Sequence, residues 1–552
     1  MKQYFRTYLF QILLLVFSVP ALYYLITPGF YEPHDLHHLA DIYQMARAIT
    51  SSQFPPRLGP DFTFGFSYPL FNFYYVLPFY IGSLFYFLFG SLTASLKSVF
   101  LLSCLLSVFG MYLFLKEFVG KVASLAGAVL FLYTPYRAVQ LYVRGAIGEA
   151  LALALLPYVA LFIIKVLKRP KPIYIFCSAI MFSSFILSHN YFFALSTPFL
   201  IFLFLLIFPE SEDKKNAVSG LIIAAVLSIG LTAYWWLPAL IEQGLVASIT
   251  PFPLVDHFPF IKQLILPSWG YGSSVWGPDD QISFQIGIVN LLAVLASVVI
   301  FIFKRSLFKN SRVFIWAIGG FFISIFFMNI RSLPIWKMLP FYNFIQFPWR
   351  LLSFTAFFSS ILLALVIEAL PKARKVLFTT LTLAMATLLT YGYFRPSKIV
   401  YKSDSDYLNY FFSDPTYSED YLLLPKWVGV RPTKKPDHKV EVENGTVEEI
   451  KEITPIKWSS RVSLDQNSKV KFNTYYFPGW TASVDGTAVQ ITSGEPYGQI
   501  ELSVSEGKHT LEFIWKETKL RRAADIISFI SLVATFLLLT EKGKAVFRRS
   551  YV

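Results

Sequence analysis

The stretch YEPHDLHHLADIYQMARAIT, residues 31–50, follows the first apolar segment and gathers polar groups that the rest of the chain avoids. Its apolar residues recur at helical spacing, and most of its polar residues fall on the opposite side. The apolar positions are Leu36, Leu39, Tyr43, Ala46 and Ile49. This pattern predicts a helix that lies on a membrane surface.

The polar side of this stretch offers candidate general bases. Glu32, Asp35 and Asp41 lie within about two helical turns of three histidines. Two simpler readings stay open: Asp35 follows Pro33 and suits a helix N-cap, and a polar helix face is usually only solvated. Because the stretch adjoins a membrane span, we favour a functional role.

The histidines of this stretch are His34, His37 and His38. Together they suggest a zinc site. However, adjacent residues of a helix point to different faces, so His37 and His38 are not expected to share a ligand. We therefore expect no zinc here.

The composition is that of a membrane protein with several spans. Of the 552 residues, 55% are hydrophobic and only 15% are charged, and the mean hydropathy is +0.54. The formal charge of +14 comes from short Lys and Arg clusters between apolar segments. This arrangement reflects membrane topology and gives no reason to expect a nucleic-acid partner.

Twelve apolar segments are long enough to cross a bilayer. The first follows Lys2 and Arg6 and is read as an uncleaved anchor rather than a signal peptide. The segments are residues 9–27, 98–115, 120–136, 149–165, 173–190, 192–208, 217–237, 285–303, 313–330, 351–370, 376–393 and 525–540.

A thirteenth segment, residues 68–90, is rich in aromatic residues and contains Pro69 and Pro78. If it does not cross fully, the basic loops and both termini lie in the cytoplasm, as the positive-inside rule requires. We therefore predict a juxtamembrane or re-entrant element, preceded by a first outer loop at residues 29–68.

Residues 394–522 change abruptly to a polar composition with alternating β-rich segments and turns such as Asn444-Gly445 and Asp485-Gly486. They predict a small extracytoplasmic β-sandwich. The expected domains are thus a membrane domain at 1–393, the sandwich at 394–522, and a final transmembrane helix with a basic cytoplasmic tail at 523–552.

Several polar residues stand at the predicted outer ends of spans, where ionisable groups favour a functional reading. Two readings of Arg144 and Glu149 stay open: they take part in a site, or they form an ion pair that only holds the loop. Arg350, together with Arg331, is preferred for binding a lipid-linked phosphate, although headgroup snorkelling is nearly as good an explanation. Further substrate-binding candidates are His38, His189, Glu242 and Gln346.

Longer motifs carry a family resemblance. HDLHHLADIYQMARAI, YVRGAIGEALA and IQFPWRLLSF resemble the bacterial 6-pyruvoyl-tetrahydropterin synthase-related membrane family. The order of the elements resembles the GT-C superfamily of membrane glycosyltransferases. The segment YYFPGWTASVDG and the final span are similar to the C-terminal part of YfhO-like proteins. Pterin chemistry is not expected from a chain that is mostly membrane.

The resemblance implies transfer of a sugar from a polyprenyl-phosphate donor to an extracytoplasmic glycan or protein acceptor, at the plasma membrane. By motif position Asp35 would act as the base or organise a divalent cation such as Mg²⁺ or Mn²⁺, assisted by Glu32 or Asp41. The alternative is a lipid-linked glycan transporter or a non-enzymatic protein of cell-envelope assembly.

Overall fold

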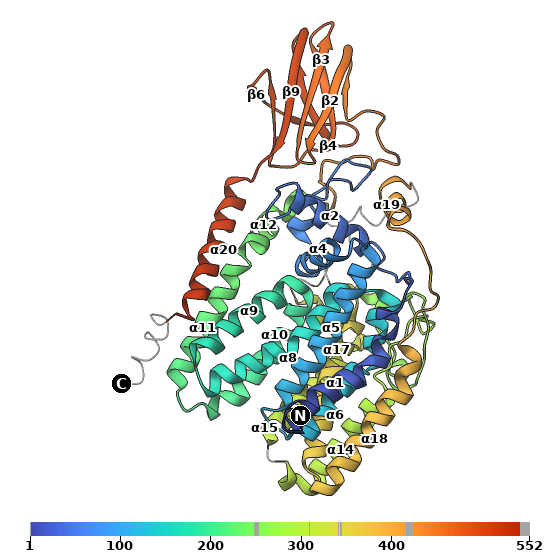
Figure 1. Cartoon of the computed structure of the whole chain (residues 1–552), viewed down its shortest axis with the longest axis vertical. Coiled ribbons are helices and arrows are strands. Elements are labelled where there is room, and N and C mark those ends of the chain that lie inside the picture. Colours follow the sequence, from blue (N-terminus) through green and yellow to red (C-terminus); the bar gives the residue numbers. More distant parts are fainter. Residues whose placement is uncertain are drawn as a thin grey trace.

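The computed structural model describes residues 2–247, 253–308, 310–339, 342, 345–414 and 423–540. These residues form a helical body with a β-sandwich at one end (Figure 1). The helices are α1 (Lys2–Ile26), α2 (His38–Thr50), α3 (Leu70–Phe73), α4 (Leu77–Phe89), α5 (Leu92–Leu115), α6 (Lys121–Leu132), α7 (Pro135–Ala138), the π-helix η1 (Val139–Arg144), α8 (Ile147–Lys168), α9 (Pro172–Ser188), α10 (Asn190–Ile207), α11 (Lys214–Leu231), α12 (Ala233–Glu242), α13 (Ile261–Ile265), α14 (Ile288–Lys304), α15 (Ser311–Phe327), α16 (Leu333–Lys337), α17 (Leu352–Glu368), α18 (Lys372–Thr390), α19 (Asp404–Ser413) and α20 (Lys519–Leu537).

Helices occupy all twelve predicted spans, which confirms a polytopic helical protein. Among the described residues, eight helices are long and apolar enough to cross a membrane, or ten if two bent pairs count as one span each. The bent pairs are α6 with residues 135–144 and α15 with residues 330–337. The two remaining predicted spans are α9, which has only 17 residues, and α20, whose first turns carry Lys519, Arg521, Arg522 and Asp525.

The aromatic segment 68–90 does not form one continuous helix. It breaks at residues 74–76 into α3 and the 13-residue α4. Helix α4 is about 20 Å long, whereas the hydrocarbon core of a bilayer is about 30 Å thick. Alone it is too short to cross, in agreement with the predicted juxtamembrane element.

Helix α2 begins at His38, later than the apolar spacing suggests, and its polar side is not solvated. His38, Asp41 and Gln44 are buried. Gln44 Nε2 donates to Asp61 Oδ2 at 2.7 Å, which ties the helix to the following loop. The simpler reading of an only solvated polar face is therefore wrong, because Asp61 and the rings of Tyr75 and Phe79 lie against these side chains.

The basic loops gather at the end of the body away from the sandwich. Lys165 Nζ lies 2.9 Å from Glu117 Oε1, and Arg312 Nη1 lies 2.8 Å from Glu210 Oε1. The Gly120 N–H donates to Glu368 Oε2 at 3.1 Å. These contacts join loops that are far apart in the sequence at one end of the helix bundle.

The β-sandwich consists of two antiparallel sheets, within the described residues, in the orders β1-β4-β8-β7 and β2-β3-β9-β5-β6. Its core includes Phe472 and Phe513, whose rings stack at 4.2 Å between the sheets. The strands are β1 (Val440–Val442), β2 (Gly445–Thr454), β3 (Lys457–Leu464), β4 (Ser468–Tyr475), β5 (Trp480–Val484), β6 (Thr487–Val489), β7 (Thr492–Gly494), β8 (Gln499–Val504) and β9 (Gly507–Trp515). The sandwich is thus confirmed, although its first strand begins only at Val440.

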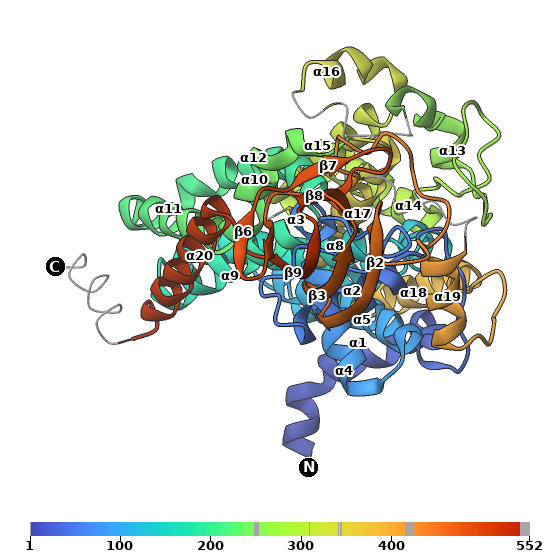
Figure 2. The same cartoon turned by 90° about the horizontal axis from the view of Figure 1, so that it is seen from above.

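The sandwich packs directly on the first loop, and seen from above its strands overlie the region of α2 (Figure 2). The Tyr475 N–H donates to the Phe66 carbonyl at 2.7 Å, and Lys439 Nζ donates to the Gly65 carbonyl at 2.6 Å. Arg47 of α2 forms an ion pair of 2.9 Å with Glu452 of β2. The sandwich therefore closes over the segment that carries the acidic candidates.

Lys439 gives this contact a pH dependence. Burial lowers the pKa of Lys439 to about 7 from its ordinary 10.5. Between these values the unfolded chain binds more protons than the folded chain, so the stability of this region rises with pH from about 7 to about 10. We expect hydrogen exchange in β1 and β4, corrected for intrinsic rates, to slow by roughly 50-fold from pH 7 to pH 9.

Lys439→Met should remove this slowing, whereas Lys469→Met, on the exposed side of β4, should retain it. Exchange by mass spectrometry on the full chain measures both. Equal pH dependence in wild type and Lys439→Met would contradict the assignment.

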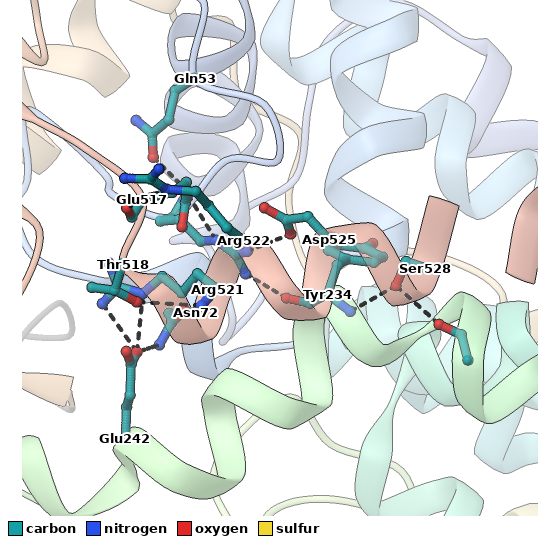
Figure 3. A network of polar contacts seen from close by, with 12 residues as sticks. Gln53, Asn72, Tyr234, Glu242, Glu517, Thr518, Arg521, Arg522, Asp525 and Ser528 are labelled. Atoms are coloured by element: carbon teal, nitrogen blue, oxygen red, sulfur yellow. Dashed lines mark hydrogen bonds and ion pairs between the residues drawn. The ribbon is translucent and has the colours of Figure 1, made fainter. Parts of the chain in front are cut away.

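A buried charged network fixes α20 to α12 and to the first loop (Figure 3). Arg521 Nη2 lies 3.0 Å from Glu242 Oε2, which also accepts from Asn72 Nδ2 at 2.7 Å. Arg57 contacts both Glu517 and Asp525, at 3.2 and 2.8 Å. These contacts explain how Arg521 can be buried in the first turn of the apolar helix α20.

Candidate functional site

The first loop is docked onto the bend between η1 and α8. The His34 N–H donates to the Val143 carbonyl at 2.9 Å, and the Asp35 N–H donates to the Arg144 carbonyl at 2.7 Å. Gly145 adopts φ +72°, and a Cβ there would lie 2.5 Å from Pro33 Cγ. Only glycine permits this approach, so the YVRG motif and the acidic loop form one unit.

Asp35 does not cap helix α2. His37 occupies the N-cap position, and no side chain caps the helix there. The N-cap reading of Asp35 is therefore wrong. Its partly exposed carboxylate instead lies close enough to Asp41 and Arg144 to interact with them electrostatically.

Glu149 is the centre of a buried polar network at the start of α8. Its Oε1 accepts from Tyr136 Oη at 2.6 Å and from Gln140 Nε2 at 2.9 Å. Its Oε2 lies 2.6 Å from Arg144 Nη1, and Ser353 donates to Oε1 at 3.3 Å. A carboxylate that is 1% exposed requires such partners, and the helix N-terminus adds a favourable dipole.

Two guanidinium groups face this single carboxylate. Arg350 Nε lies 3.7 Å from Glu149 Oε2, too far for a hydrogen bond, and Arg350 Nη2 donates to Gln346 at 3.3 Å. Within the described part of the chain, the buried Arg350 Nε has no hydrogen-bond partner. Arg144 stacks over Trp349 with 4.7 Å between its Cζ and the ring centroid. The paired guanidinium groups and the unused donor suit an anion such as a phosphate.

His189 and Tyr75 connect this network to the first loop. His189 Nδ1 accepts from the Phe192 N–H and so caps helix α10. Its ring stacks on Tyr75 at 5.2 Å, and Tyr75 lies 6.5 Å from the His38 ring. His189 also lies close enough to Arg350 to interact with it electrostatically. The predicted candidates Asp35, His38, Arg144, Glu149, His189, Gln346 and Arg350 thus lie in one contiguous region.

At the start of α2, two histidines meet Asp41. His38 Nδ1 lies 3.0 Å and His37 Nε2 lies 3.8 Å from Asp41 Oδ2. Burial raises the pKa of Asp41 to about 7, against the opposing effect of His37. The expectation that His37 and His38 point apart is wrong, because His37 precedes the helix and its ring lies 4.3 Å from that of His38.

Two other candidates lie outside this region. Glu32 pairs with Lys398 and Lys402, on the segment that leads to the sandwich. Glu242 belongs to the network with Asn72 and Arg521 (Figure 3). The sequence placed both at the same membrane face as the site but could not reveal their partners.

Four residues of the region were missed from the sequence: Tyr75, Tyr136, Gln140 and Ser353. Gln140 is the one with a usable signal, since it lies between two predicted spans, in the same short outer segment as Arg144. Tyrosine and serine are common in such segments and give no comparable signal. Gln140 lies on the π-helix η1, which the sequence did not predict.

The donor set at the start of α2 discriminates between the expected cations. Mg²⁺ prefers oxygen ligands in octahedral geometry, which two imidazoles and one carboxylate do not supply. Imidazole and carboxylate together suit Mn²⁺ or Zn²⁺. The residues present therefore fit a transition-metal ion and not magnesium.

Comparisons with known proteins give one family and several structures. A family model described as "6-pyruvoyl-tetrahydropterin synthase related domain; membrane protein" matches residues 71–397. No curated protein matches the chain. The matched region contains Arg144, Glu149 and Arg350, whereas Asp35 precedes it.

The similar solved structures share 14–16% identity with this chain. An oligosaccharyltransferase from Archaeoglobus fulgidus has a TM-score of 0.44, with 78% of this chain and 61% of that chain covered. The arabinofuranosyltransferase AftD from Mycobacteria has a TM-score of 0.48, with 70% and 27% covered. ArnT from Cupriavidus metallidurans has a TM-score of 0.40, with 68% and 63% covered. The chain thus spans less than two thirds of each of these proteins.

Proposed function

The chain belongs to the 6-pyruvoyl-tetrahydropterin synthase-related family of membrane proteins, as its motifs indicate, and on this premise we propose that it is a membrane glycosyltransferase. It transfers a sugar from a polyprenyl-phosphate-linked donor to an extracytoplasmic glycan or protein acceptor. The proposal rests on the resemblance carried by the motifs and on the geometry of the region around Asp35 and Arg350.

One observation carries the proposal: a partly exposed carboxylate is held beside a buried pair of guanidinium groups. The Asp35 backbone is bonded to Arg144, and Arg144 shares Glu149 with Arg350. A transferase that uses a phosphate leaving group needs a base on one side and cations on the other. The unused Nε donor of Arg350 supports a phosphate there.

The reaction follows from these positions. Asp35 accepts the proton of an acceptor hydroxyl while that oxygen forms a bond to the anomeric carbon of the donor sugar. The bond between this carbon and the phosphate oxygen breaks, and the lipid phosphate leaves with the electron pair. Arg350 and Arg144 stabilise the negative charge that grows on the leaving oxygen. Attack from the face opposite the phosphate inverts the anomeric carbon.

The distribution of charge supports an extracytoplasmic site in the plasma membrane. Glu149 stands at the first turn of α8, and Lys168 stands at its last, about 28 Å away, among the basic loops. Positive loops face the cytoplasm. Residues 31–50, the Glu149 network and the sandwich then lie outside, and the N-terminus lies inside. The basic tail, residues 541–552, is not among the residues that the structure describes.

The decisive experiment follows radiolabelled sugar from polyprenyl-phosphate donors in the presence of purified full-length protein and candidate acceptors. Product formation by the wild type and its loss in Asp35→Asn are expected. Donor binding with no turnover across a panel of glycan and peptide acceptors would count against a transferase and favour a lipid-linked glycan transporter.

Arg350→Ala is expected to weaken binding of the polyprenyl-phosphate donor by roughly 10- to 100-fold, the effect of losing a charge-assisted hydrogen bond. Binding to the detergent-solubilised protein by competition with a labelled lipid phosphate measures it. Arg331→Ala is the matched control, because Arg331 is exposed on another part of the same loop. Unchanged affinity in a folded Arg350→Ala variant would reject the phosphate role.

A further inference from the structure

Three side chains converge where the first loop enters α2. His37 and Asp41 are one helical turn apart, and His38 and Asp41 are three residues apart, so all three face the same space. Their possible ligand atoms lie within 4.8 Å of one another. We propose that His37, His38 and Asp41 bind one transition-metal ion of the zinc class. The proposal adds a cofactor to the proposed transferase, and its test does not depend on sugar transfer.

The distances suit coordination of a single ion. Ligand atoms about 2.0–2.1 Å from a tetrahedral zinc ion are about 3.3 Å from one another. Asp41 Oδ2 lies 3.0 Å from His38 Nδ1 and 3.8 Å from His37 Nε2. Small side-chain rotations bring both contacts to the required separation. Three protein ligands leave a fourth position for water or substrate.

Burial distinguishes this cluster from ordinary surface charge. His38 is 1% and Asp41 is 2% exposed, and the rings of Tyr75 and Phe79 lie 6.5 and 5.6 Å from the His38 ring. A carboxylate in such apolar surroundings gains from a cation much more than one in water. The side chain of His37 remains 22% exposed, which leaves an approach for an ion.

The chain contains a matched pair that lacks the second histidine. In the sandwich, His509 Nδ1 lies 2.7 Å from Asp485 Oδ2. Among the described residues, no third histidine, cysteine or acidic residue completes a possible metal site with this pair. A histidine hydrogen-bonded to an aspartate is therefore present at both places. Only the pair at α2 has the third donor and the buried carboxylate.

The test is direct binding of Co²⁺ to the tag-free full chain in detergent after treatment with a chelator. Co²⁺ can replace Zn²⁺ in such sites, and it absorbs visible light strongly when its coordination number is low. Wild type and His509→Ala are expected to bind about one Co²⁺ per chain, displaced by Zn²⁺. His37→Ala and Asp41→Asn should bind at least tenfold more weakly.

His37→Ala is the more informative variant, since the His37 side chain is the most exposed of the three and can be removed without opening the core. Absence of Co²⁺ binding to wild type, or unchanged binding to His37→Ala, overturns the proposal. Loss of binding in His509→Ala overturns it as well, because the ion then lies in the sandwich. If the wild type transfers sugar without binding metal, the metal proposal is wrong and the transferase proposal stands. If it binds metal without transferring sugar, the metal proposal stands and the transferase proposal is wrong.

Discussion

Asp35→Asn is expected to reduce sugar transfer by at least about 100-fold while leaving the protein folded and able to bind its lipid donor. The amide keeps the shape of the carboxylate but cannot accept the acceptor's proton. The contact that fixes this loop is made by the Asp35 main chain, whose N–H donates to the Arg144 carbonyl, so the substitution should not displace it. Initial rates with radiolabelled donor measure the loss.

Glu32→Gln is the matched control in the same loop. Glu32 pairs with Lys398 and Lys402, whose side chains are 67% and 50% exposed, and these exposed ion pairs contribute little stability. We expect a less than tenfold change in rate. Retention of most activity by Asp35→Asn, or an equal loss in Glu32→Gln, would contradict the role of Asp35 as base.

Glu149→Ala is expected to destabilise the protein by about 3–5 kcal/mol, the cost of leaving a buried cation without its partner. Arg144 and Arg350 both face this carboxylate, and Tyr136 and Gln140 donate to it. Its removal leaves two buried guanidinium groups without their shared counter-charge and the Tyr136 hydroxyl without its acceptor. Thermal unfolding in detergent, followed by tryptophan fluorescence, measures the change.

The comparison for this variant is Glu210→Ala. Glu210 pairs with Arg312 at 2.8 Å, but both side chains are more than 40% exposed. Such a pair contributes about 1 kcal/mol at most. A similar, small effect in both variants would mean that water reaches Glu149 and that the network does not hold the fold.

The periodicity and the composition of the sequence were enough to predict most helices and most strands of the sandwich. The apolar segments and the β-rich segments 439–442, 458–463, 470–475, 481–484, 500–504 and 510–515 depend on local pattern, and the structure confirms the latter as β1, β3, β4, β5, β8 and β9. Strand β2 was missed because its inward and outward residues do not alternate cleanly: GTVEEIKEIT is mostly exposed. The family was also identified from motifs, and its model confirms it.

The candidate site was predicted in part. Arg144, Glu149 and Arg350 were found because ionisable residues at span ends are rare, and the structure brings them together. The roles assigned to them remain predictions. Glu242 satisfied the same criterion, yet its partner Arg521 lies 279 residues away in the sequence, and a local pattern carries no information about such a partner. The meeting of His37 and His38 depends on where α2 begins, which spacing alone placed too early.

The buried Arg57 has a consequence for biosynthesis. Its guanidinium contacts Glu517 and Asp525, which lie 460 and 468 residues later in the chain. A ribosome makes the arginine long before it makes either acid, so the guanidinium stays uncompensated through most of translation. The loop that joins α2 to α3 can therefore reach its final packing only after α20 has emerged, and completion of this face of the protein is among the last steps of its assembly.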